Sequence, residues 1–134
     1  MINAPDVWDP TLDVGDPIID GQHRTLYRMI VDLDKSMSRE AFGQAVLDAL
    51  NGMKAYARTH FQHEEDLMER SAWPGLVAHK ALHTSFMQKA AQFGGNALAD
   101  SEWTSLDMLR YLMDWLVKHI RVHDRAFFTW LSQR

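Results

Sequence analysis

The 134-residue chain contains no cysteine. This absence excludes disulfide bonds, thiolate metal sites, cysteine-ligated iron–sulfur clusters and a cysteine nucleophile. Basic residues are also few, with 14 Lys and Arg against 18 Asp and Glu and no basic block, which argues against nucleic-acid binding. No apolar run approaches the roughly 18 residues of a membrane span, and residues 1–10 lack the pattern of a signal peptide. We therefore expect a cytoplasmic protein without a membrane anchor, in which any metal is held by nitrogen and oxygen atoms.

Helix-breaking residues are concentrated in residues 1–18, which contain three prolines and a glycine. This segment is predicted to be an extended N-terminal arm, because proline and glycine there forbid a long helix. Three apolar side chains would hold the arm against the rest of the protein: Trp8, Leu12 and Val14.

Residues 19–131 show no strand-like alternation, and their apolar residues recur every three or four positions. This spacing predicts four amphipathic helices joined by short connections, and therefore an all-α, antiparallel up-down-up-down four-helix bundle. A chain of this length forms a single domain, residues 1–134, and we expect it to be a monomer.

Local signals predict where some of the helices begin and end. Ser38 is a suitable N-cap for the second helix, and Pro74 can occupy the first turn of the third. The pair Gly94-Gly95 is predicted to terminate the third helix.

Each predicted helix places at least one histidine on its inward face, where an apolar residue would suffice for folding. A buried polar group is costly unless it is hydrogen-bonded, paired or bound to metal, and a shared metal site accounts for all of these histidines together. Imidazole with carboxylate suits iron, manganese or zinc, and two ions would use the donors better than one. The inward histidines are His23, His60, His79, His83 and His119.

Two nearby ions also require bridging carboxylates, and spacing alone leaves their identity open. Glu64 lies one helical turn after His60, but His63 continues the apolar stripe equally well. Asp124 lies five residues after His119, about 140° away on an ideal α-helix, whereas His123 is nearly aligned. A local π-type turn would bring Asp124 inward instead.

Four segments together resemble the hemerythrin family, in particular its single-domain bacterial members. The likeness covers nearly the whole chain, from Trp8 to about Phe127, and all seven ligand positions of the family occur in the right order and spacing. The segments that carry it are VG…IDGQH (14–23), HFQHEEDLM (60–68), HKALH (79–83) and WLVKHIRVHD (115–124).

The resemblance implies a non-haem centre of two iron ions joined by an oxo or hydroxo bridge. One iron would keep an open position, where O2 would bind and take one electron from each iron. By the same resemblance, His63 and His123 match positions that are not ligands. The implied ligands are His79, His83 and His119 on one iron, His23 and His60 on the iron with the open position, and Glu64 and Asp124 as bridges.

The function that the resemblance implies is reversible O2 binding for storage, delivery or scavenging, rather than enzymatic turnover. Two alternatives are an O2, redox or iron sensor that acts through a separate protein partner, and a di-iron protein that handles peroxide or nitric oxide. Apolar residues next to the ligands, or one turn from them, are candidates for the O2 pocket: Phe61, Phe86, Trp115, Leu116 and Ile120.

Overall fold

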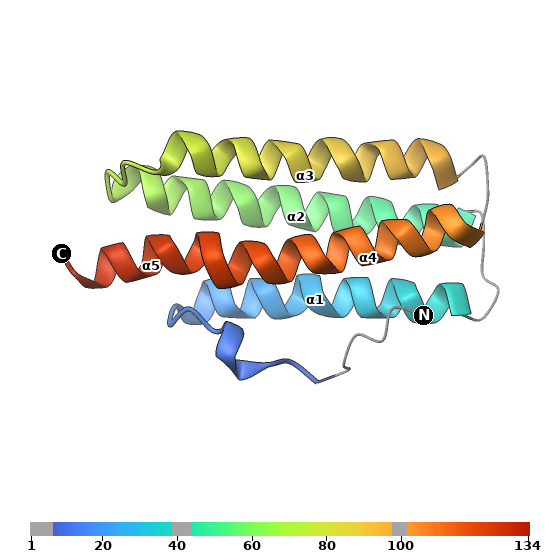
Figure 1. Cartoon of the computed structure of the whole chain (residues 1–134), viewed down its shortest axis with the longest axis horizontal. Helices are drawn as coiled ribbons and strands as arrows, with labels where there is room; N and C mark the ends of the chain where they lie inside the picture. Colours follow the sequence, from blue (N-terminus) through green and yellow to red (C-terminus); the bar gives the residue numbers. More distant parts are fainter. Residues whose placement is uncertain (1–6, 39–43, 98–101) are drawn as a thin grey trace.

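In the computed structural model, which describes residues 7–38, 44–97 and 102–134, four helical rods lie side by side and alternate in direction (Figure 1). Each rod packs against the next one along the chain, and α4 also packs against α1. This arrangement confirms the predicted antiparallel four-helix bundle. The rods are α1 (Pro17–Ser38), α2 (Gln44–Arg70), α3 (Leu76–Ala97), and a fourth that consists of α4 (Glu102–Lys118), the π-helical segment η2 (His119–Asp124) and α5 (Arg125–Ser132).

The interior of the bundle has two chemically different halves. The half farther from the α2–α3 turn is apolar, with residues such as Ile30, Leu50 and Leu109 that are at most 1% exposed. Burial of each such side chain contributes about 1.5–3 kcal/mol. The half nearer that turn contains buried histidines and carboxylates, and beyond them Phe127 and Met68 are again fully buried. The polar centre is therefore enclosed between apolar layers.

The helix ends predicted at residue 19, at Ser38 and at the Gly94-Gly95 pair are wrong. Helix α1 begins at Pro17 rather than at residue 19, because Asp16 accepts hydrogen bonds from the amides of Ile18 and Ile19 and proline fits the first helical position. Ser38 is the last residue of α1 and not the cap of the next helix. Helix α3 continues through the Gly94-Gly95 pair to Ala97, since glycine lowers helix stability without forcing a chain reversal. The N-cap of α4 lies outside the described residues.

The turn between α2 and α3 is a Schellman motif. Ala72 has a left-handed backbone with φ of 55°, and the amide of Trp73 donates to the carbonyl of Met68 at 3.1 Å. Pro74 precedes α3, which begins at Leu76, so it lies just outside the helix rather than in its first turn. A Cβ atom on Gly75 would come within 2.5 Å of the indole of Trp73, so glycine is required for the ring to pack there.

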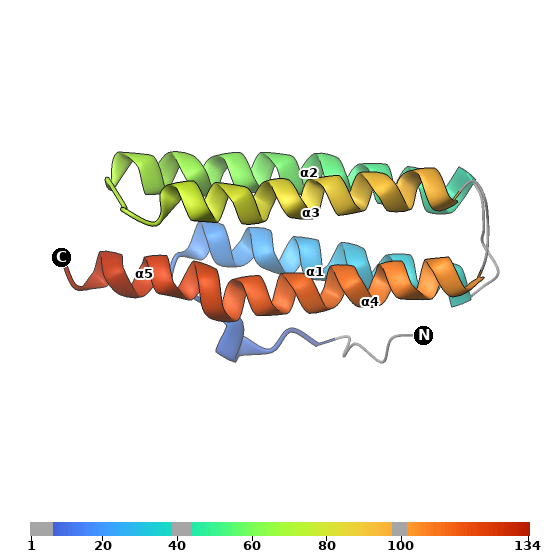
Figure 2. The same ribbon diagram turned by 45° about the horizontal axis from the view of Figure 1, so that its top comes forward.

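The N-terminal arm is held against α1 and the fourth rod (Figure 2). As expected, Leu12 is buried, and Trp8 and Val14 pack against the core. The arm includes a short 3-10 turn, η1 (Pro10–Leu12). Asp20, buried in the first turns of α1, accepts hydrogen bonds from the amides of Val14 at 2.7 Å and Gly15 at 3.2 Å. None of the described helices has the length and apolar character needed to cross a membrane.

Candidate metal centre

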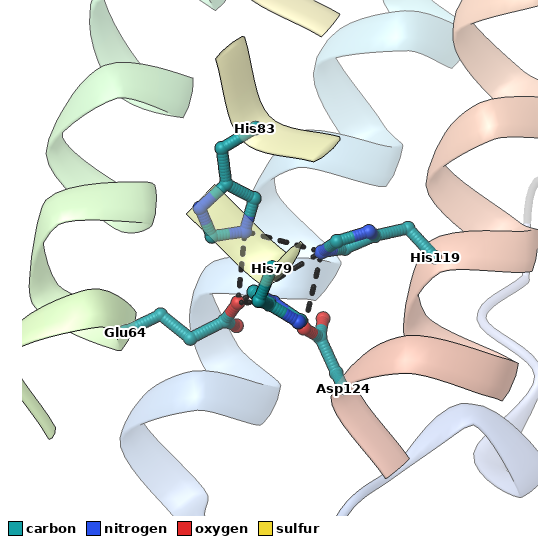
Figure 3. A group of neighbouring side chains, drawn as sticks. All are labelled: Glu64, His79, His83, His119 and Asp124. Carbon is teal, nitrogen blue, oxygen red and sulfur yellow. Dashed lines mark hydrogen bonds and ion pairs between the residues drawn. The ribbon is translucent and has the colours of Figure 1, made fainter. Parts of the chain in front are cut away.

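Five imidazoles and two carboxylates from all four rods converge in the polar half of the bundle. Figure 3 shows three of the imidazoles with the two carboxylates. All seven side chains are at most 3% exposed, and each histidine presents its Nε2 atom to the carboxylates. The donor atoms form two overlapping groups, and within each group all of them lie within 4.8 Å of one another. The two groups are Glu64, His79, His83, His119 and Asp124, and His23, His60, Glu64 and Asp124.

Glu64 and Asp124 belong to both groups, and each turns one oxygen to either side. Oε1 of Glu64 lies 2.9 Å from Nε2 of His79, whereas Oε2 lies 3.3 Å from Nε2 of His60. Oδ1 of Asp124 lies 3.0 Å from Nε2 of His79, whereas Oδ2 lies 3.0 Å from Nε2 of His23. This is the arrangement expected of two carboxylates that bridge a pair of cations.

Helix geometry accounts for most of these positions. His60 and Glu64 lie four residues apart on α2, and His79 and His83 lie four residues apart on α3, so each pair shares one face. The fourth rod departs from α-helical spacing.

In η2, the amide of Arg125 donates to the carbonyl of Ile120, five residues earlier, which is the hydrogen bond of a π-helix. The wider turn brings Asp124 to the same face as His119, with 3.2 Å between Oδ1 and Nε2.

The two histidines that spacing could not exclude lie outside both groups. His63 is partly exposed and lines a surface hollow with Asp66 and Glu69. The ring of His123 is also partly exposed, and its centre lies 5.6 Å from that of His119. Neither contributes a donor atom to the converging set.

Six buried atoms of this cluster lack a hydrogen-bond partner: both ring nitrogens of His23, Nδ1 of His119, Oε2 of Glu64 and both oxygens of Asp124. Four of the six, Nε2 of His23, Oε2 of Glu64 and both oxygens of Asp124, nevertheless lie within 3.5 Å of an oppositely polar atom of the cluster. These atoms are close to one another but do not have the orientation of hydrogen-bond partners. Uncompensated buried polar atoms are rare in native proteins. Nitrogen and oxygen donors aimed at shared points fit bound cations, and the absence of thiolates suits iron, manganese or zinc.

The charges of the cluster also favour the binding of cations. Burial lowers the pKa of His23 and of His79, but the close carboxylates of Asp124 and Glu64 outweigh burial and raise each pKa to about 9. Burial raises the pKa of Glu64, but hydrogen bonds from His119 and the other imidazoles hold it well below its usual value. Two carboxylates therefore stay ionised in the core, and either protons or metal ions on the imidazoles must balance them.

Comparison with known proteins establishes the family to which this chain belongs. A family model described as "Hemerythrin HHE cation binding domain" matches residues 14–131. This chain belongs to the hemerythrin family. A bacteriohemerythrin of Stenotrophomonas maltophilia is 34% identical over 125 residues, which cover 90% of this chain and 78% of that protein. A bacteriohemerythrin of Clostridium acetobutylicum is 27% identical, covering 90% and 97%, and myohemerythrin-1 of Phascolopsis gouldii is 28% identical, covering 92% of each.

Two residues that the sequence did not single out contact the histidines of this hemerythrin domain from outside. Nδ1 of His60 lies 2.6 Å from Oε1 of Gln22, and Nδ1 of His83 lies 2.6 Å from Oε2 of Glu65. Because an amide oxygen and a carboxylate can only accept, each Nδ1 carries the proton, and Nε2 is left with a lone pair directed inward. Gln22 and Glu65 each lie on a different helix from the histidine that they contact, so no spacing within one helix could reveal them.

The residues predicted to form the O2 pocket lie on one side of the hemerythrin centre, toward the apolar half. The ring of Phe61 stacks on that of His83 at 4.0 Å and 9°, and the ring of Trp115 stacks on that of His119 at 4.3 Å and 11°. Phe86 contacts both Phe61 and Trp115. Leu116 and Ile120 are buried in the same core cluster. These residues separate the polar centre from the remainder of the core.

Proposed function

We propose that this protein binds O2 reversibly at a centre of two iron ions and serves in O2 storage, delivery or scavenging. The observation that carries the proposal is the sharing of Glu64 and Asp124, each with one oxygen toward a three-histidine group and the other toward a two-histidine group. Two separate mononuclear sites would not require both carboxylates in common. The names of the relatives, bacteriohemerythrin and myohemerythrin, support the same function.

The proposed ligands divide unequally, and this inequality provides the binding position. His79, His83 and His119 would hold one iron, and His23 and His60 the other, with an oxo or hydroxo bridge between them. With one imidazole fewer, the iron held by His23 and His60 would be the one with a position left for O2. When bound, the irons would supply one electron each to O2.

The protein supplies orientation and exclusion of water. Gln22 and Glu65 fix the Nδ1–H tautomer of His60 and His83, so that their Nε2 lone pairs face the ions. The layer of Phe61, Phe86 and Trp115 excludes water from one side of the centre. Slow access of water and protons favours release of intact O2 over irreversible oxidation.

An optical spectrum of the purified, iron-loaded and reduced protein, recorded before and after addition of O2 and again after its removal, tests the proposal. We expect charge-transfer bands that appear with O2 and disappear when it is removed. Such bands would also distinguish iron from zinc, because a zinc centre lacks them. A matched preparation of Glu64→Ala should show neither the bands nor a full complement of iron. Steady-state consumption of peroxide or nitric oxide beyond stoichiometric amounts would instead identify a redox enzyme and refute a role in O2 binding alone.

A further inference from the structure

A groove of about 350 Å³ opens between α2 and α3 and extends to the metal centre. Its walls include the apolar side chains of Phe61, Met87 and Ala91, and one of its lining residues is the proposed ligand His83. A volume of this size is typical of small-molecule sites rather than protein interfaces. His83 is therefore the residue through which the groove and the metal centre are connected.

The inner end of the groove has direct contacts with that imidazole. Glu65, which lines the groove, accepts the Nδ1–H hydrogen bond of His83 at 2.6 Å and is itself partly accessible. Phe61 lies parallel to the same imidazole with 4.0 Å between ring centres. A flat aromatic molecule on Met87 and Ala91 would therefore contact Phe61, a buried ring that stacks on a metal ligand.

The outer end of the groove has a positive charge. Arg58 lines it, is exposed, and has no hydrogen-bond or ion-pair partner among the residues that the structure describes. Arg58 and Glu65 are seven residues apart on α2, which is two helical turns or about 10 Å. The groove thus combines an apolar floor, an anion-binding group at one end and a hydrogen-bond acceptor at the other, with the amides of Gln62 and Gln88 along its sides.

We propose that this groove binds a reduced flavin that carries a phosphate group, and that the flavin returns the oxidised metal centre to its reduced state through His83. The ring system would lie on Met87 and Ala91, in contact with Phe61, and the phosphate at Arg58. This proposal rests on the proposed function, because an iron centre whose electrons leave with reduced oxygen, instead of returning when O2 is released, cannot bind O2 again until it is reduced. Among organic redox carriers, flavins suit acceptors that take electrons singly.

The electron transfer balances without a further reactant. The reduced flavin gives up two electrons and two protons and becomes the oxidised flavin. Each of two iron(III) ions takes one electron and becomes iron(II), and the protons pass to solvent. No bond forms between the flavin and the protein.

Binding is tested with the iron-loaded protein and two probes that differ only in the phosphate, flavin mononucleotide and riboflavin, by titration of flavin fluorescence. We expect Arg58→Gln to weaken binding of flavin mononucleotide about three- to tenfold, the effect of one exposed charge pair, and to leave riboflavin unchanged. The matched control Arg110→Gln removes an equal charge from an exposed position on α4 and should change neither. Equal binding of the two flavins to the unaltered protein would overturn the proposal.

Electron delivery is tested by anaerobic rapid mixing of the oxidised protein with reduced flavin mononucleotide. The reduction rate should saturate with flavin concentration in the unaltered protein and lose saturation in Met87→Trp, which fills the groove. Thr84→Phe, at an exposed position on the rim, is the second variant if Met87→Trp does not fold. Dithionite, a small reductant that needs no groove, should reduce all folded variants at the same rate.

An unchanged flavin rate in both groove-filling variants would overturn the proposal. The O2-dependent spectrum, recorded on the same preparations, reports separately on the proposed function. Its presence together with an unchanged flavin rate would refute only the flavin site. Its absence would refute O2 binding, while the two-flavin titration would still decide whether the groove is a flavin site.

Discussion

Removal of the metal should lower the thermal stability of this protein by an amount that its buried polar atoms allow us to estimate. Four such atoms, Nε2 of His23, Oε2 of Glu64 and both oxygens of Asp124, face the centre and have no hydrogen-bond partner without a cation. At about 1–3 kcal/mol each, their gross destabilisation is comparable with the whole stability of a domain, about 5–15 kcal/mol. Protons on the imidazoles offset part of it. If a third remains, about 1–4 kcal/mol, the melting temperature should fall by roughly 4–16 °C for a chain of this size.

The size of this decrease should depend on pH in a definite direction. In the metal-free protein the pKa of His23 and of His79 is about 9, above the value near 6.5 that histidine has in the unfolded chain. Protonation of these two groups therefore stabilises the metal-free fold fully below pH 6.5, and this stabilisation is lost as the pH rises toward 9. Bound metal displaces the protons, so the metal-loaded protein should not lose stability for this reason. The difference in melting temperature should widen between pH 6.5 and 9.

Far-ultraviolet circular dichroism of metal-loaded and chelator-treated protein, melted at several pH values in this range, measures both effects. His63→Ala provides a control, because this partly exposed side chain contributes no donor atom to the centre. It should show the same difference as the unaltered protein. Coincident melting curves with and without metal would refute the conclusion that the cluster is built for cations. A difference that narrows with rising pH would refute the assignment of the stabilising protons to His23 and His79.

Three further predictions concern single residues. Glu64→Ala should lose iron because both donor groups share this carboxylate, whereas His63→Ala should retain both ions; metal analysis of the two purified variants compares them directly. Glu65→Ala removes the acceptor of the Nδ1–H hydrogen bond of His83 and should weaken metal binding about 10–100-fold, as measured by competition with a chelator. An unchanged metal affinity would show that Glu65 does not orient His83. Ala72→Gly should raise the free energy of unfolding by about 1 kcal/mol, because a φ of 55° strains alanine. Ala55→Gly, at an exposed position within α2, should lower it by a similar amount. Denaturant unfolding that gave both variants the same free energy of unfolding would contradict this prediction.

The fold could be predicted from local information to a large extent. Apolar spacing of three and four residues defines helices, and short connections make neighbouring helices antiparallel. The ends of the helices were less predictable. Pro17 is compatible with the arm or with the first turn of a helix, and Ser38 and the Gly94-Gly95 pair are each compatible with a helix interior or with an end.

The sequence by itself determined that five histidines face the interior and that their ligand chemistry contains no sulfur. Periodicity alone left two choices open, Glu64 or His63 and Asp124 or His123. Only the tertiary structure decided them physically: Glu64 points to both donor groups, and the π-helical hydrogen bond to Ile120 turns Asp124 inward. Contacts between helices, such as those from Gln22 and Glu65 to the imidazoles, were likewise invisible in the sequence. The reason is that side-chain periodicity specifies which face of a helix is buried, whereas the rotation and register of one helix against another specify which atoms meet.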